Sequence, residues 1–455
     1  MHYEELRRKY PVFRYDSFEF EKTPTQAIAR FKFSAPPDIS FSPEVIFESV
    51  PDGWHSVPDK FLNNTIFHLG LIELFSYWKA TASPVIEVHA GGLILEQTKF
   101  WENLLMRGMG EFFYRNDIDF TVPNFVKITS TGTRLVIPYL AALPQRSLLT
   151  IGGGRDSALA AGVLRDSGQP FACMMLNPSQ AAQSIASKVT AAPPIIARRT
   201  ICRELLELNQ RGFLNGHTPF SAYLAFLGAT CMLLYGYSNV IVANERSSDE
   251  GNVSYRGHEI NHQYSKSLAF ETLFDQYMHK YLITSAKYFS LVRPFYELQI
   301  GKMFSAYPEF FDLFKSCNRN RSISWCGECP KCLSVFSTMY PFVPRETLVR
   351  IFGRDLYHSQ ESIPIVRALA GLETKPFECV GTAGEIVAAL SLAVESANKR
   401  GEALSPVLAD AMKSIPAVGN TGAALEILSS YGPHRLSPAF ERSLTRVLNE
   451  SPRSR

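Results

Sequence analysis

Short apolar segments alternate with helix-forming segments between residues 147 and 243. Strands are predicted at 147–151, 171–176, 195–197 and 240–243, and helices at about 157–166 and 220–235. Strands that alternate with helices form a mainly parallel sheet with helices on both faces, and its ligands bind at the carboxyl ends of the strands. The pattern therefore predicts a doubly wound α/β domain at residues 146–344.

Two regions with other patterns flank this predicted domain. Residues 27–33 alternate as a strand does, whereas 61–78 and 100–114 are predicted helices. Residues 1–145 are therefore predicted to form an N-terminal α+β domain, with substrate recognition as its expected role. Residues 345–455 have helical patterns interrupted by Gly and Pro and are predicted to form a helical cap.

Composition and charge exclude several classes of protein. Hydrophobic residues make up 46% of the 455 residues and aromatic residues 12%, which rules out a disordered chain. Forty-six Lys and Arg against 43 Asp and Glu leave a net charge of +3, so bulk charge indicates neither a nucleic-acid nor a membrane-surface partner. Residues 218–244 lack charged side chains, but Pro219, Gly236 and Asn239 interrupt them, which favours a helix and a strand over a membrane span. The charged N-terminus predicts a cytoplasmic location.

A glycine loop follows the first strand of the predicted sheet. Glycine permits positive φ and lets backbone N–H groups approach a phosphate at the N-terminus of a helix. Arg155 supplies a cation, Asp156 a candidate Mg²⁺ ligand, and Ser157 a helix cap or a hydroxyl donor. The predicted phosphate-binding residues are Gly152, Gly153, Gly154, Arg155, Asp156 and Ser157. A tight strand-to-helix turn without a ligand is the alternative.

Two common nucleotide-binding loops do not fit this segment. The chain contains no G-x-x-x-x-G-K-[ST]. Ser157 stands where the dinucleotide fingerprint has its third glycine, and the second strand ends at Asn177 without a ribose-binding acid. Asn177 remains a candidate nucleotide contact. The loop resembles the PP-loop of the ATP pyrophosphatase superfamily, whose members have Ser-Gly-Gly-x-Asp-Ser here and cleave ATP to AMP and pyrophosphate. Gly152 replaces the usual Ser, which removes one hydroxyl donor.

Four of the eight cysteines lie close together in the sequence. Their spacing is C-x8-C-x2-C-x2-C, at Cys317, Cys326, Cys329 and Cys332. Four thiolates suit tetrahedral Zn²⁺ and leave no position open for water, so a structural zinc is predicted. Free buried cysteines and an iron–sulfur cluster are the alternatives. A similar spacing occurs in 7-cyano-7-deazaguanine synthases, which also belong to the PP-loop superfamily.

Polar residues follow the strand at 240–243, on the edge where ligands bind. The candidate catalytic residues in and near this run are Glu245, Asp249, Glu250, His262, Tyr264, Lys266 and His217, beside Asp156 of the glycine loop. A charged surface loop is the alternative for the run. Thr218 is the predicted N-cap of the next helix and Pro219 its first residue. For His217, helix capping and catalysis both remain open.

The motifs taken together resemble one family, the ATP-dependent UDP-N-acetylmuramoyl-L-alanyl-L-glutamate epimerases, MurL. The resembling pieces are FHLGLIE at 67–73, YWK at 77–79, GGGRDS at 152–157, GHTPFSA at 216–222, NERSSDEGN at 244–252, HQYSKS at 262–267, WCGECPKC at 325–332 and KPFECVGT at 375–382. Each piece alone is weak, but their order along the chain is specific. The resemblance spans residues 67 to 382.

The resemblance implies a reaction and its participants. UDP-MurNAc-L-Ala-L-Glu would be converted to its D-Glu epimer for peptidoglycan through an acyl-adenylate, with ATP and Mg²⁺ consumed and AMP and pyrophosphate released. It implies Mg²⁺-binding or base roles for Glu245, Asp249 and Glu250, and pyrophosphate or adenylate contacts for Arg246 and Lys266. His217, His262 and Tyr264 remain proton-transfer candidates.

Other mechanisms and functions remain open. Cys379 is the one cysteine in a motif outside the predicted zinc site, so a two-thiol mechanism is not expected. The alternatives are a PP-loop enzyme of tRNA or deazapurine modification and a non-catalytic nucleotide sensor. Nucleic-acid and membrane partners are not expected.

Overall fold

A large mixed sheet forms the centre of the protein. The computed structural model describes residues 2–133, 138–319 and 324–450. The strand order is β13-β10-β7-β8-β9-β4-β2-β1-β5-β6, with β3 beside β2 and a separate β11-β12 hairpin. The strands are β1 (Val12–Lys22), β2 (Gln26–Ala35), β3 (Ile39–Phe41), β4 (Glu44–Glu48), β5 (Val85–Val88), β6 (Lys127–Ser130), β7 (Ser147–Thr150), β8 (Phe171–Leu176), β9 (Ile195–Thr200), β10 (Asn239–Val242), β11 (Val253–Tyr255), β12 (His258–Ile260) and β13 (Lys287–Ser290).

Strands β7, β8, β9, β10 and β13 run parallel to one another and are covered on both faces. Leu148 of β7 belongs to one hydrophobic core and Leu149 to the other, as expected for a strand buried on both sides. On the Leu149 face pack α5 (Arg155–Ser167) and α6 (Gln180–Val189), and on the Leu148 face pack α8 (Phe220–Tyr235) and α9 (Leu268–Tyr281). The predicted α/β class with a mainly parallel sheet is confirmed.

The strand order reverses at β7. From β7 the chain continues to β8 and β9 on one side, whereas β10 and β13 lie on the other. A crevice forms outside the carboxyl ends of parallel strands where the order reverses. The loops at this point are the glycine loop after β7 and the polar loop 243–252 after β10.

The sheet continues into the N-terminal region through an antiparallel pair. Strand β9 pairs with β4, and β4, β2 and β1 follow in antiparallel order. The strand predicted at 27–33 lies within β2, and the helix predicted at 61–78 is α2 (Asp59–Trp78), which packs on β1 and α8. The helix predicted at 100–114 is instead two helices, α3 (Leu95–Gly108) and α4 (Gly110–Arg115).

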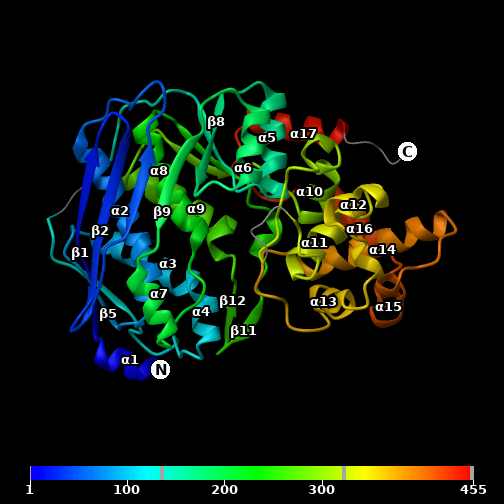
Figure 1. Ribbon diagram of the computed structural model, residues 1–455, viewed down its shortest axis with the longest axis horizontal. Helices are drawn as coiled ribbons and strands as arrows, with labels where there is room; N and C mark the ends of the chain where they lie inside the picture. The colour runs from blue at the N-terminus through cyan, green and yellow to red at the C-terminus, as the bar shows by residue number, and fades with distance from the viewer. Residues whose placement is uncertain (1, 134–137, 320–323, 451–455) are drawn as a thin grey trace.

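After β13 the described chain forms helices and turns. In Figure 1 helices α10 to α16 gather on the side away from β1 and β2, whereas α17 returns to pack against α5. The remaining helices are α1 (Tyr3–Lys9), α7 (Arg203–Gln210), α10 (Glu297–Phe304), α11 (Pro330–Met339), α12 (Arg345–Phe352), α13 (Ser362–Leu369), α14 (Ala383–Lys399), α15 (Pro406–Ser414), α16 (Gly422–Ser429) and α17 (Pro438–Glu450). Within the described ranges, no helix has both the length and the apolar character needed to cross a membrane.

Candidate functional site

The glycine loop connects β7 to the N-terminus of α5. Gly153 has φ +90°, and a Cβ there would lie 2.7 Å from both the Ala181 Cβ and the Ala182 nitrogen, so only glycine fits. The N-cap of α5 is Gly154, and Ser157 lies inside the helix, where its hydroxyl donates to the Gly154 carbonyl at 3.0 Å. Ser157 is therefore not the helix cap.

Residues after α10 pack over this loop. The Lys315 N–H donates to the Gly153 carbonyl at 2.8 Å, and the Arg155 N–H donates to Ser316 Oγ at 3.2 Å. Lys315 Nζ is buried and has no hydrogen-bond partner among the described residues. The N–H groups at the N-terminus of α5, with Lys315 packed against the loop through its backbone, give the loop the electrostatics of an anion site.

Arg155 points into the protein, where its charge is neutralised. Its Nε lies 3.0 Å from Asp156 Oδ1, and its Nη2 lies 3.4 Å from Glu297 Oε2. Glu297 also pairs with Lys331 Nζ at 2.9 Å. Burial alone would raise the pKa of Glu297, but Lys331 and Arg155 lower it to about 2. Arg155 therefore holds Asp156 in place, and Glu297 is a member of the site that the sequence did not reveal.

Glu245 is a buried carboxylate that lacks a donor. It follows β10, its side chain is 1% exposed, and both its oxygens lack a hydrogen-bond partner among the described residues. Burial raises its pKa, which the Lys266 ammonium opposes and the Asp156 carboxylate reinforces. Leaving a buried carboxyl unsatisfied costs free energy, so Glu245 marks a place where a cation or a proton is expected.

A second group of titratable side chains, here named the thiol cluster, consists of Cys379, Lys266, His262 and Glu111. Lys266 Nζ lies 3.1 Å from Cys379 Sγ, and His262 Nε2 lies 4.0 Å from the same sulfur. The other ring nitrogen of His262 hydrogen bonds to Glu111 Oε2 at 2.6 Å. His217 is next to the cluster, with its ring centre 4.3 Å from that of His262.

These contacts and burial set the pKa values of the titratable side chains in and next to the thiol cluster. Burial would raise the pKa of Cys379, but Lys266 and His262 lower it to about 7. Burial opposes a charge on His262, yet Cys379 and Glu111 raise its pKa to about 9. Burial, together with the neighbouring His262, lowers the pKa of His217 to about 4. At neutral pH His262 is therefore mainly an imidazolium, about half of Cys379 is thiolate, and His217 is neutral.

Several predicted site residues form hydrogen bonds or ion pairs that connect different segments of the chain. Asp249 Oδ1 accepts the Leu268 N–H at 2.8 Å at the start of α9. Glu250 pairs with Lys375 at 2.8 Å, which joins the polar loop to the segment that carries Cys379. Asn177 is left-handed, with φ +47°, and its side chain bonds to the Arg199 backbone.

Two other predicted residues lie against aromatic or amide groups. The Arg246 guanidinium stacks 4.4 Å from the centre of the Tyr296 ring. Tyr264 donates to Asn103 Oδ1 at 3.4 Å, and the Arg107 guanidinium lies 4.9 Å from the centre of its ring. The predicted capping of α8 by Thr218 is wrong, because α8 begins one residue later, with Pro219 at the N-cap.

The four predicted metal-binding cysteines come together in space. All four sulfurs lie within 4.8 Å of one another, with Cys329 and Cys332 at 3.4 Å and Cys326 and Cys332 at 3.6 Å. Tetrahedral Zn²⁺ with Zn–S bonds of about 2.3 Å requires sulfurs roughly 3.8 Å apart. The donor set therefore fits a closed zinc site, here named the cysteine knuckle.

The cysteine knuckle is connected to the glycine loop through Glu297 and to the thiol cluster through Glu378. Lys331 lies within it and pairs with Glu297 through its side chain. The Lys331 N–H and the Asn318 amide donate to Glu378 Oε2 at 3.0 Å and 3.1 Å. Because Glu378 precedes Cys379, the knuckle fixes the segment that presents the thiol.

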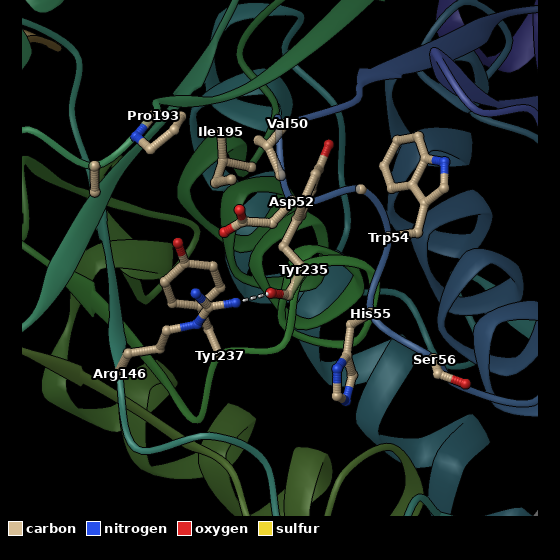
Figure 2. A pocket seen from close by; sticks show the side chains of 12 residues that line it. Val50, Asp52, Trp54, His55, Ser56, Arg146, Pro193, Ile195, Tyr235 and Tyr237 are labelled. Atoms are coloured by element: carbon tan, nitrogen blue, oxygen red, sulfur yellow. Dashed lines mark hydrogen bonds between the residues drawn. The ribbon is translucent and has the colours of Figure 1, made fainter.

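Two cavities lie near opposite ends of the parallel strands. One of about 1060 Å³ is bordered by Asp249 and Tyr264 beside the polar loop. Figure 2 shows another, of about 330 Å³, at the amino ends of the parallel strands, where Arg146 precedes β7 and Tyr237 precedes β10. The second cavity therefore opens on the edge opposite the glycine loop.

Sequence reasoning passed over Glu111 and left Cys379 without a role. Glu111 lies in α4 between the buried apolar residues Met109 and Phe112. The feature that could have identified Glu111 is a single carboxylate in an otherwise apolar helix. Burying a carboxylate without a partner costs free energy, so such a residue is expected to have a partner or a function. Cys379 was set apart by its motif, but its partners lie too far away in sequence to be inferred.

Comparisons with known proteins place the chain in a family. A family model described as the MurL N-terminal domain matches residues 4–291, and one described as the MurL C-terminal domain matches residues 313–425. A protein of Micromonospora sp. named UDP-N-acetyl-alpha-D-muramoyl-L-alanyl-L-glutamate epimerase is 31% identical over 97% of this chain and 99% of its own length.

Two further relatives carry the same name. The protein of Salinispora tropica is 31% identical over 94% of each chain, and that of Xanthomonas oryzae pv. oryzae is 32% identical over 82% of this chain and 83% of its own. The two family models together match residues 4–291 and 313–425 of the chain. The chain therefore belongs to the MurL family.

Proposed function

We propose that the protein epimerises the terminal L-Glu of UDP-MurNAc-L-Ala-L-Glu to D-Glu, with ATP cleaved to AMP and pyrophosphate. The observation that carries the proposal is the carboxylate of Glu245 where the strand order reverses, which is buried, has no hydrogen-bond donor among the described residues and interacts electrostatically with Lys266 and Asp156. The names of the three relatives supply the substrate and the type of reaction.

The need for ATP follows from the acidity of the α-proton. A carboxylate opposes a carbanion on its neighbouring carbon because both are negative. Joining that carboxylate to AMP removes its charge and makes the α-proton far more acidic. A base then removes the proton, and protonation of the opposite face by solvent inverts the centre before hydrolysis releases AMP.

The glycine loop supplies the groups for activation. Backbone N–H groups at the N-terminus of α5 and the unpaired Lys315 ammonium would hold the phosphates. This arrangement supports a PP-loop assignment. A cavity of about 1060 Å³ beside the polar loop has room for part of a nucleotide-sugar.

Two metal ions complete the proposal. Asp156 and Glu245 would hold Mg²⁺, because Glu245 offers two buried oxygens that no donor in the described part of the chain satisfies. Mg²⁺ would neutralise negative charge on the phosphates. The cysteine knuckle would hold a structural Zn²⁺.

One incubation tests the function. Purified protein with ATP, Mg²⁺ and UDP-MurNAc-L-Ala-L-Glu is expected to form AMP and pyrophosphate and to yield the D-Glu epimer, measured by chiral analysis after hydrolysis. Free L-glutamate is the control and is expected to react poorly, because it lacks the binding energy of the nucleotide-sugar. AMP formation with tRNA or a deazapurine precursor, and none with the dipeptide, would favour the alternative.

A further inference from the structure

Cys379 stands between two basic side chains. Its sulfur lies 3.1 Å from Lys266 Nζ and 4.0 Å from His262 Nε2. Cys231 in α8 provides a contrast, because there burial alone raises the pKa of the thiol. Cys379 is only partly buried, whereas Cys231 is fully buried. A thiol becomes a reactive thiolate when positive charge is near and a substrate can reach it.

Glu111 fixes the orientation of His262. Its Oε2 accepts the hydrogen bond from His262 Nδ1 at 2.6 Å, and its Oε1 accepts one from Arg115 at 2.7 Å. This contact leaves His262 Nε2 facing the sulfur. The order of carboxylate, imidazole and thiol is the arrangement by which proteins activate a cysteine.

The thiol cluster adjoins the proposed activation site. The segment that carries Cys379 is attached to the polar loop, because Asn252 donates to the Pro376 carbonyl at 3.0 Å. Lys266 interacts electrostatically with both Cys379 and Glu245. A substrate carboxylate activated near Glu245 would therefore bring its α-carbon toward the sulfur.

We infer that the Cys379 thiolate is a catalytic base that removes the α-proton of the activated glutamate, an assignment that rests on the proposed function. The C–H bond breaks, an S–H bond forms, and the electron pair delocalises into the acyl carbonyl. Water supplies a proton to the opposite face of the carbanion, and the resulting hydroxide takes the thiol proton by way of His262. The thiolate is restored, and atoms and charge balance.

Substitution of Cys379 separates proton transfer from activation. In D₂O with ATP and Mg²⁺, Cys379→Ala is expected to lose α-deuterium incorporation by about 10²–10⁴-fold, the usual contribution of a positioned base. AMP release in the same sample is expected to stay within about tenfold of the wild-type rate, since the glycine loop is unchanged. Cys231→Ala is the matched control and is expected to retain both activities.

Two results would overturn the assignment. One is normal deuterium incorporation by Cys379→Ala. The other is an acyl group on Cys379 in the mass spectrum of a quenched wild-type reaction, because a covalent thioester would make the sulfur a nucleophile. A wild-type protein that forms no AMP would instead refute the proposed function.

Alkylation tests the thiolate independently of turnover. Iodoacetamide labelling of Cys379, followed by peptide mass spectrometry, is expected to reach half of its maximal rate near pH 7. Half-maximal labelling at the ordinary thiol pKa of about 8.5 would contradict a stabilised thiolate.

Glu111 acts through His262 and is a positioning residue. Glu111→Gln is expected to move the upper limb of the pH profile of deuterium incorporation to lower pH, because the carboxylate raises the pKa of His262. Glu111→Asp is expected to restore part of the shift. An unchanged profile in Glu111→Gln would show that the carboxylate has only a structural role.

Discussion

Charged side chains lie at both ends of the parallel strands, and the two ends differ in whether the fold supplies hydrogen-bond partners for these charges. At the amino ends, Arg146 donates to the carbonyls of Tyr235 and Gly236 and stacks 4.3 Å from the centre of the Tyr237 ring (Figure 2). At the carboxyl ends, both oxygens of Glu245 and the ammonium of Lys315 are buried without a hydrogen-bond partner among the described residues.

We interpret a charged side chain whose partners come from the fold as structural, and one whose partner must be a ligand as functional. Two nitrogens of the Arg146 guanidinium donate to fixed backbone carbonyls, so the fold itself supplies partners for this charge. Glu245 and Lys315 destabilise the fold unless a ligand compensates for them. Such a cost is tolerated where a substrate or cation provides the missing partner. We therefore expect substitutions at the carboxyl edge to reduce activity and those at the amino edge to reduce stability.

The largest effect is expected for Asp156→Ala. Loss of a proposed Mg²⁺ ligand should lower AMP formation on the order of 10³-fold, as loss of a strong electrostatic contact in an active site does. The fold should survive, because Arg155 keeps its contacts with Glu297 and Thr338. AMP formation and thermal unfolding, measured side by side, check both statements. AMP release close to the wild-type rate would remove Asp156 from the activation site.

Glu245→Gln is expected to lower AMP formation by about 10²-fold and to raise thermal stability. The amide retains the shape of the side chain but removes a buried charge that has no donor among the described residues. Calorimetry is expected to show a higher unfolding temperature, by roughly 1 °C for each 1 kcal/mol gained in a chain of 455 residues. Lower stability combined with full activity would mean that Glu245 is structural, and the distinction between the edges would fail.

The pH dependence of α-deuterium incorporation is expected to be bell-shaped. Incorporation needs the Cys379 thiolate, so it should fall about tenfold per pH unit below the thiol pKa of about 7. It also needs the His262 imidazolium, so it should fall above the imidazole pKa of about 9. Stopped-time deuterium measurements between pH 5.5 and about 10.5 test both limbs. A profile that is flat from pH 6 to 9 would contradict the assignment.

Cys329→Ser is expected to lower stability before it affects chemistry. The wild-type protein should contain about one Zn²⁺ per chain by metal analysis, and the variant should lose it. A loss of about 2 kcal/mol would lower the unfolding temperature of a chain of 455 residues by roughly 2 °C. Deuterium incorporation should decline next, since the knuckle holds Glu378, the neighbour of Cys379. A metal-free wild-type protein with unchanged stability would argue against the zinc site.

Local patterns predicted the parallel half of the sheet but not its continuation. Strands β7, β8 and β10 are short apolar runs, so their sequences alone identify them. The pairing of β4 with β9 joins residues 44–47 to residues 197–200. Nothing in either sequence specifies that partner, because antiparallel pairing depends on tertiary packing.

Local sequence patterns likewise predicted only the part of the site that follows predicted strands. The glycine loop and Glu245 each follow a predicted strand, so the rule for parallel sheets placed them on one edge. The thiol cluster has no such local signal, because Glu111 and His262 are 151 residues apart and His262 and Cys379 are 117 apart. Glu297 could not be predicted as a site residue for the same reason, since its partners Arg155 and Lys331 come from helices distant in sequence.

The smallest effect on activity is expected for Arg146→Ala, which tests the comparison from the amino edge. Removing the guanidinium leaves the Tyr235 and Gly236 carbonyls without their charged donor and should cost about 1–3 kcal/mol of stability. AMP formation should stay within about twofold of the wild-type rate at a temperature where the variant is folded. A large loss of AMP formation without a loss of stability would mean that the amino-edge cavity takes part in the reaction. The unsatisfied charges at the carboxyl edge would then not be sufficient to locate the chemistry.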